Sequence, residues 1–167
     1  MATPQTPADA AIAFSAHDHR HCSDDLLAKA QSLAEARGAR LTPVRRRVLE
    51  ILLEAHRALG AYEVLQRLAA DGYGNQPPVA YRALEFLVRQ GLAHRIDRLN
   101  AFTACTHPAD AHNPVFFICR TCSTVAEAAG PSVRAAIADS ASTIGFVVER
   151  VTAEALGLCP SCKGAAA

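Results

Sequence analysis

Two Cys-X-X-Cys pairs constrain the fold of this chain more than any other feature. They are Cys119 with Cys122 and Cys159 with Cys162, and residues 123–158, 36 in all, separate them. Each pair can form a knuckle whose thiolates point to one centre, and four thiolates complete the closed tetrahedron of a structural zinc site. Unligated core cysteines or a redox dithiol are the alternatives, although a thioredoxin-like motif would have a single pair at a βα turn. The two pairs therefore predict a zinc ion that contributes directly to folding.

Length and hydropathy indicate the cell compartment in which these cysteines would function. The chain has 167 residues, which suits one ordinary domain or two small ones. No apolar run approaches the ~18 residues of a membrane helix, and the N-terminal stretch lacks the basic start of a secretory signal. We therefore expect a cytoplasmic protein with no membrane partner, whose six cysteines are reduced and available as metal ligands.

Helical signals followed by a hairpin occupy residues 24–104. Thr42-Pro43 offers an N-cap hydroxyl and a first-turn proline, and Gly91 offers a C-terminal glycine. The predicted helices run from Asp24 to Gly38, from Pro43 to Gly60, over Ala61–Ala70 and from Pro77 to Gly91, and the predicted hairpin strands are Ala93–Arg98 and Ala101–Ala104. Three helices, a further helix bearing arginines and then a hairpin follow the order of a winged-helix DNA-binding domain.

Residues 1–23 form a predicted mobile tail. Alternating histidines and a thiol in this tail could hold metal weakly, and the simpler interpretation is a polar tail. The residues concerned are His17, His19, His21 and Cys22.

A linker at residues 105–114 leads into a small mixed domain at residues 115–167. Its predicted elements are strands at Val115–Ile118, Thr124–Ala128 and Phe146–Ala153 and a helix over Pro131–Ile144. The side chains expected on the inward face of the helix are Val133, Ala136, Ile137 and Ile144. A domain of this size buries little core alone, so we expect a metal and a partner subunit to stabilise it. The whole chain is thus predicted to be α+β with two domains.

Basic charge gathers in the first domain. The net charge of +1 (17 basic minus 16 acidic groups) averages over residues 37–98, which hold eleven arginines and six acidic residues. The planar guanidinium fork suits phosphates and guanine edges. Arg82 and Arg89 lie seven residues apart, on the face of their helix opposite the apolar stripe. A solvated helical surface is the alternative, so charge alone leaves nucleic-acid binding open.

A second set of possible metal ligands surrounds the remaining cysteine of the folded region. They are Cys105, His94, His107, His112 and Glu127. One thiolate, one carboxylate and two neutral imidazoles would bind zinc with zero net charge. Such a mixed set should exchange metal more readily than four thiolates and lose affinity as histidine protonates, which suits sensing. Each of these residues could equally be an ordinary surface group.

Taken together, these residues resemble the ferric uptake regulator superfamily and, within it, the zinc-sensing branch. The similarity runs from about Asp24 to Cys162 and rests on the strings RLTPVRRRVL, GAYEVLQRL, PPVAYRALEFLVRQGLAHRI, FFICRTC and GLCPSC. It implies an N-terminal winged helix followed by a small α/β dimerisation domain. It also implies a homodimer that, when loaded with metal, binds AT-rich, inverted-repeat operator DNA and represses uptake genes.

The resemblance also implies two zinc sites in each monomer. The structural ligands would be Cys119, Cys122, Cys159 and Cys162, and the regulatory ligands would be His94, Cys105, His112 and Glu127. Tyr62 and Arg82 fall on positions that such regulators use against DNA. We expect Arg82 on base edges, Tyr62 and the Arg45–Arg47 cluster on the DNA backbone, and Arg89 as a further contact.

Departures from the family pattern favour zinc as the sensed metal. Iron- and peroxide-sensing relatives usually carry a histidine-rich string before the first Cys-X-X-Cys pair, whereas this chain reads AHNPVFFIC there and has Leu156 where histidine is frequent. Cys105 supplies a soft thiolate, which favours zinc over ferrous iron. His107 rivals His112 as the third ligand.

Two other functions stay open at this stage. An iron- or manganese-responsive repressor of the same superfamily is one. The other is a zinc-stapled adaptor or enzyme subunit that binds protein or RNA through its basic face. We do not expect an enzyme or a small organic substrate, because the chain has neither an HExxH helix nor the H-x-E…P-C-x-x-C arrangement of a deaminase.

Overall fold

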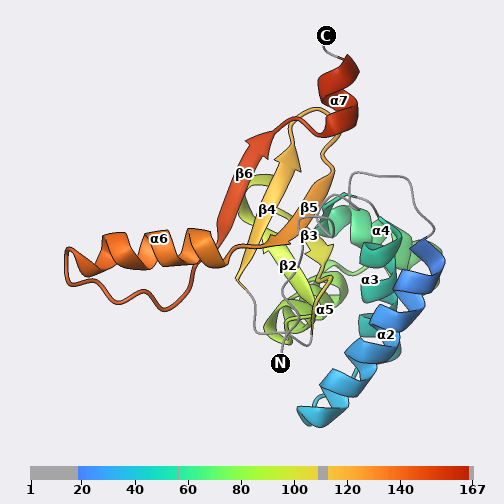
Figure 1. Cartoon of the computed structure of the whole chain (residues 1–167). Helices are drawn as coiled ribbons and strands as arrows, with labels where there is room; N and C mark the ends of the chain where they lie inside the picture. Colours follow the sequence, from blue (N-terminus) through green and yellow to red (C-terminus); the bar gives the residue numbers. More distant parts are fainter. Residues whose placement is uncertain (1–18, 56, 109–112, 166–167) are drawn as a thin grey trace. The chain divides into compact units, whose positions relative to one another are not determined.

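The computed structural model describes residues 19–55, 57–108 and 113–165, which form two compact units (Figure 1). One unit holds the described residues up to Pro108 and the other holds those from Asn113 onward. The region after Cys105, expected to be a linker, therefore still contributes residues to the first unit. No helix in the described part of the chain is long and apolar enough to cross a bilayer.

Four helices begin the first unit. They are α2 (His19–Ala36), α3 (Pro43–Glu54), α4 (Ala61–Ala70) and α5 (Pro77–Arg89). α2 begins at His19 rather than at Asp24, so residues 19–23 belong to a helix and not to the expected tail. His17 lies outside the described residues. The predicted bounds of α4 are confirmed to the residue.

Two details of α3 differ from expectation. The hydroxyl of Thr42 forms no capping hydrogen bond, and its carbonyl instead accepts the N–H of Arg46 at 2.9 Å. The helix ends at Glu54 rather than continuing to Gly60, because Leu59 and Gly60 form a short strand, β1 (Leu59–Gly60). Leu59 is fully buried in that strand.

The start and the end of α5 are clearly marked in the sequence, by proline and by glycine. Two prolines occupy its first turn, where their missing N–H groups cost nothing. At its end Gly91 takes φ +67°. The N–H groups of Gly91 and Leu92 donate to the carbonyls of Val88 and Leu87 at 3.0 and 2.9 Å, which closes the helix in a Schellman motif. The predicted start and end of α5 are thus confirmed.

The wing is a three-stranded antiparallel sheet in the order β1-β3-β2. β2 (Ala93–Ile96) and β3 (Ala101–Ala104) form the predicted hairpin, joined by a 3-10 turn η1 (Asp97–Leu99) and by Asn100 at φ 45°. β1 was not predicted, because two residues carry no periodic signal. It pairs Leu59 with Phe102, which ties the wing to the start of α4.

Apolar side chains from α2 to β3 form one core in this unit. α5 contributes Leu84 and Leu87, both with 0% exposure, while its opposite face leaves Arg82, Glu85 and Arg89 exposed. Full burial of one leucine side chain stabilises a fold by about 1.5–3 kcal/mol. The core therefore fixes α5 by one face and presents its charged face to solvent.

The second unit is a sheet in the order β5-β4-β6 with two helices. Its elements are β4 (Pro114–Cys119), β5 (Val125–Ala129), α6 (Pro131–Ser142), β6 (Ala153–Gly157) and α7 (Pro160–Ala165). β4 pairs antiparallel with β5 and parallel with β6. The predicted third strand, Phe146–Ala153, is wrong: residues 146–152 form no strand, and pairing with β4 begins only at Ala153. This register sets Cys119 opposite Gly157, immediately before the second cysteine pair.

The expectation of an inward face on α6 is also wrong for this chain. Val133 and Ile137 are each 39% exposed, Ile144 is 79% exposed, and Ala136 is exposed as well. α6 extends away from the sheet of its own unit rather than lying over it (Figure 1). The apolar face therefore lacks a cover among the described residues of the unit.

Candidate metal centres and nucleic-acid interface

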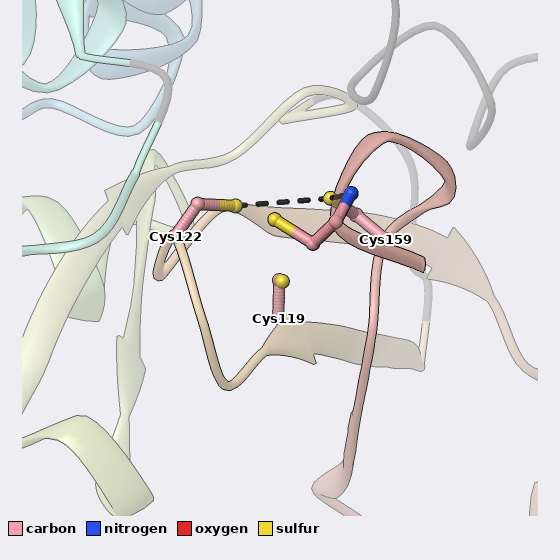
Figure 2. A group of neighbouring side chains, drawn as sticks. Cys119, Cys122 and Cys159 are labelled. Carbon is pink, nitrogen blue, oxygen red and sulfur yellow. Dashed lines mark hydrogen bonds between the residues drawn. The ribbon is translucent and has the colours of Figure 1, made fainter. Parts of the chain in front are cut away.

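The four cysteines of the second unit come together as the spacing predicts. β4 ends at Cys119, a turn carries Cys122, and β6 leads into Cys159 and the first turn of α7 with Cys162. The four Sγ atoms lie within 4.8 Å of one another. In Figure 2 the sulfur atoms of the three labelled cysteines point into one space, and those of Cys122 and Cys159 are 3.8 Å apart. A zinc–sulfur bond of ~2.3 Å in a tetrahedron separates its sulfurs by about 3.8 Å, so this spacing fits zinc.

The electrostatics of the cluster also call for a cation. The backbone N–H of Cys122, followed by that of Cys159, lowers the pKa of Cys119 to about 6. The neighbouring thiol of Cys159, together with burial, raises the pKa of Cys162 to about 12. The thiols of the cluster therefore influence one another's ionisation, and neighbouring thiolates repel each other. A bound divalent ion removes this conflict, because it is coordinated by thiolates.

The hairpin of the first unit brings two further ligand types together. His94 lies on β2, paired with Thr103 of β3. The N–H of Cys105 donates to the carbonyl of Leu92 at 3.0 Å, which extends the ladder beyond the two strands. As a result, one ligand atom of His94 and the Sγ of Cys105 lie within 4.8 Å of each other. Cys105 is 2% exposed and is a free thiol.

Three further residues are proposed as ligands of the regulatory zinc. Glu127 lies on β5 of the second unit, opposite Phe116. His112 lies outside the described residues. The Nδ1 atom of His107, the rival ligand, is 2.9 Å from the hydroxyl oxygen of Thr106. The hairpin thus supplies half of the predicted four-ligand set, and the complete set stays a prediction.

The exposed face of α5 and the start of α4 carry the residues predicted to meet DNA. Arg82 and Arg89 are exposed and form no ion pair with another residue in the described part of the chain. Tyr62, at the second position of α4, is 66% exposed. The N–H of Gly60 donates to the carboxylate of Glu63 at 3.0 Å, which fixes the turn before Tyr62. The ion pair with Arg57, followed by this hydrogen bond, lowers the pKa of Glu63.

The three arginines at the start of α3 are engaged within the protein. The guanidinium carbon of Arg45 is 3.7 Å from the centre of the Phe86 ring. Arg46 pairs with Glu50 at 3.0 Å. Arg47 pairs with Asp71 at 2.6 Å and with Glu54 at 2.7 Å, and these carboxylates raise its pKa. The expectation that this cluster serves the DNA backbone is therefore weakest for Arg45 and Arg47.

The sequence reasoning missed Tyr81 as a surface residue of α5. Its side chain is 42% exposed and precedes Arg82. Helical spacing gave no signal, because Tyr81 lies three residues before Leu84 and seven before Val88, on the side of the apolar stripe. A partly exposed phenol next to Arg82 adds an aromatic group with a hydrogen-bonding hydroxyl to this surface.

Comparison with known proteins agrees with this arrangement. The model of the ferric uptake regulator family matches residues 36–155. A zinc uptake regulation protein of Escherichia coli (strain K12) is 34% identical over 142 residues, 84% of this chain and 82% of the relative. Two solved structures are similar over nearly all of their own length. A zinc uptake regulator complexed with zinc and DNA has a TM-score of 0.82 at 32% identity, covering 86% of this chain and 97% of that chain. A structure described as holo XcZur has a TM-score of 0.76 at 33% identity, covering 84% and 99%.

The family match extends over more than half of the chain and includes α3, α4, α5, the wing, β4, β5 and the first cysteine pair. The identity to the E. coli relative exceeds 30% over most of both chains. The chain belongs to the ferric uptake regulator family, whose members regulate transcription.

Proposed function

We propose that this chain is a zinc-responsive transcriptional repressor, which binds inverted-repeat operator DNA as a zinc-loaded homodimer and controls zinc uptake genes. The observation that carries the proposal is the pairing of His94 with the buried thiol of Cys105 on the wing hairpin. The thiolate is a soft donor, which favours zinc over ferrous iron or manganese, and imidazole is a common zinc ligand. The similarity to zinc uptake regulators, one of them described with zinc and DNA, supports the same choice.

The two metal sites would have different roles. Cys119, Cys122, Cys159 and Cys162 would hold a structural zinc ion, because four thiolates leave no open coordination position. His94, Cys105, His112 and Glu127 would hold the regulatory zinc. His94 and Cys105 belong to the winged-helix unit and Glu127 to the second unit. A metal held by all of them would couple the two units and favour the arrangement that fits DNA.

DNA recognition would follow the logic of a winged helix. α5 would enter the major groove, with Arg82 on base edges and Arg89 and Tyr62 on the backbone. An inverted repeat requires two such helices at a fixed separation, which a symmetric dimer provides. The exposed apolar residues of α6, among them Val133 and Ile137, offer a surface for that dimer. This role requires no catalysis, and a cytoplasmic location gives access to DNA and keeps the thiols reduced.

Operator binding measured against metal tests the proposal. The purified chain is titrated onto a duplex that carries the inverted repeat from a zinc-uptake promoter, with zinc, iron(II), manganese(II) or a chelator. We expect a gel shift with zinc that the chelator reverses and that a scrambled duplex does not give. A shift only with iron or manganese would identify a different sensor of the same family. No metal-dependent shift on any duplex would favour a zinc-stapled adaptor.

A further inference from the structure

α5 is contacted by two arginines from other segments of the first unit. Arg45 lies in the first turn of α3 and Arg37 directly follows α2. Their contacts on α5 are Phe86, in the C-terminal part of the helix, and Gln90, its C-cap, four residues later. α3 and α5 pack against each other through the core of the unit. Two separate segments therefore contact the C-terminal part of α5, one helical turn apart.

Arg45 makes two contacts that use its guanidinium. Its central carbon is 3.7 Å from the centre of the Phe86 ring, well within the range of a cation–π interaction. Its Nη1 atom donates to the carbonyl of Arg40 at 2.7 Å. Phe86 is 4% exposed, so the ring itself is part of the core. Arg45, which is only partly buried, thus places its guanidinium on the face of a buried aromatic ring.

Arg37 meets the C-terminal end of α5, one turn beyond Phe86. Its Nη1 atom donates to the carbonyl of Gln90. The last carbonyls of a helix lack partners within the helix and carry the negative end of its dipole, so a guanidinium there is favourable. Gln90 immediately precedes the Gly91 turn that leads into the wing. Arg37 therefore fixes the point where α5 passes into β2.

The position of Arg45 in its own helix argues that it serves another element. The first turn of α3 holds no acidic residue and includes Arg45 and Arg46, although the helix dipole disfavours cations at that end. Arg82 offers the contrast, because its exposed guanidinium forms no ion pair in the described part of the chain. Arg82 is free to meet a ligand, and Arg45 is committed to α5.

We propose that Arg45 and Arg37 are positioning residues, which set the orientation of α5 for operator recognition without contacting DNA themselves. This inference rests on the proposed DNA-binding function and revises the expectation that Arg45 contacts the DNA backbone. A phosphate contact and a positioning role have different signatures. Loss of a phosphate contact weakens all DNA equally and lowers the salt slope by about one. Loss of a positioning contact lowers preference for the operator and leaves the slope unchanged.

The test compares R45M, R37M and the control R46M in the zinc-loaded full chain. R46M removes a charge from the same turn of α3 without touching Phe86, since Arg46 pairs with Glu50. The readouts are affinity for operator and random duplex, the salt slope on random duplex, and amide hydrogen exchange along α5. We expect R45M and R37M each to lower the ratio of operator to random affinity about five- to tenfold, with an unchanged slope. R46M should keep that ratio even if Arg46 contacts the DNA backbone, because loss of a phosphate contact weakens operator and random binding equally and lowers only the salt slope.

Hydrogen exchange separates failure of the inference from failure of the proposed function. α5 should exchange faster in R45M and R37M than in R46M, while α4 exchanges equally in all three, whether or not the wild type prefers the operator. A double variant, R45M with Phe86→Leu, should lose little more operator preference than Phe86→Leu alone, because the two residues act through one contact. Unchanged α5 exchange, or a salt slope lowered by about one in R45M, would overturn the positioning role.

Discussion

The arginines of the first unit differ in what their side chains face. Arg82 and Arg89 are exposed on α5, whereas Arg45 and Arg47 are bound to Phe86 and to carboxylates of their own unit. Exposed ion pairs contribute only about 0.2–1 kcal/mol each, so stability alone does not explain so many arginines. The division indicates one group of arginines that shapes the winged helix and another that can meet a ligand.

Replacing Arg82 tests the second group. Arg82→Ala should cost about 1–3 kcal/mol of operator affinity if the guanidinium reads a base edge. Affinity for random duplex should change far less, so the preference for operator should flatten. Competition binding with operator and random duplex measures both values. An equal loss of affinity for the two duplexes would indicate that Arg82 contacts a phosphate and not a base edge.

Replacing Cys105 distinguishes a role in zinc sensing from a role in folding. Cys105→Ser should abolish zinc-dependent operator binding, because the wing would lose its soft ligand. Burying a hydroxyl in its place should lower the stability of the unit by about 1–3 kcal/mol without unfolding it. Circular dichroism and gel shift on one preparation give both readouts. Cys119→Ser is the counterpart and should unfold the second unit. If Cys105→Ser unfolds its unit while Cys119→Ser leaves a folded protein unable to sense zinc, the two roles are interchanged.

Residues could be predicted where the signal is local. The spacing of the two Cys-X-X-Cys pairs is visible in the sequence itself, and the cluster that the four cysteines form matches the prediction. Similarly, His94 and Cys105 lie on opposite sides of a hairpin that the turn residues in the sequence predict. The contact between Arg45 and Phe86 could not be predicted, because it depends on how α3 packs against α5.

At the scale of elements, Gly130 shows how tightly β4 is packed. A Cβ atom at Gly130 would collide with Cγ2 of Val115 and would lie 3.2 Å from the carbonyl oxygen of Asn113. Val115 is buried and β-branched, so it cannot turn aside easily. The turn between β5 and α6 therefore requires glycine for close approach to β4.

Gly130→Ala should destabilise the second unit by about 1–3 kcal/mol through overpacking. Gly157→Ala on β6 is the matched control, since a Cβ there meets no heavy atom within 4 Å. Thermal unfolding of the zinc-loaded protein compares the two variants. Equal unfolding temperatures for Gly130→Ala and the wild type would contradict the tight contact.

The exposed apolar face of α6 belongs to the proposed dimer. Ile137→Asp should shift the protein from dimer toward monomer, because it places a charge in an apolar interface. Ala135→Asp adds the same charge to an exposed position about 200° away around α6. Analytical ultracentrifugation of both variants measures the dissociation constants. A dimer that Ile137→Asp leaves intact would exclude this face from the interface.

Helices and strands could be predicted where capping residues mark both of their ends. They were missed where they form only through pairing with a strand that is distant in the sequence. Gly60 and the Asp71-Gly72 turn enclose α4, so its bounds follow from the sequence. β1 has two residues and exists through its pairing with β3. β6 takes its register from β4, which no alternation in residues 146–153 reveals. The inward face of α6 was misassigned because periodicity identifies an apolar face without identifying what covers it.

At the scale of the whole molecule, the near-neutral charge conceals two different units. The net charge of +1 combines an arginine-rich winged helix with a second unit built around four thiols. If the proposed regulatory zinc takes ligands from both units, metal binding and DNA binding would depend on one arrangement of the units. Two ligands that favour the same arrangement must strengthen each other's binding by the same factor.

Zinc affinity measured with and without operator tests this coupling most directly. The structural site is filled first, and zinc is then titrated into the free dimer and into the dimer bound to operator, with scrambled duplex as control. We expect operator to tighten zinc binding by about 5–150-fold, and zinc to tighten operator binding by the same factor. Equal zinc affinity in the presence and absence of operator would contradict this expectation.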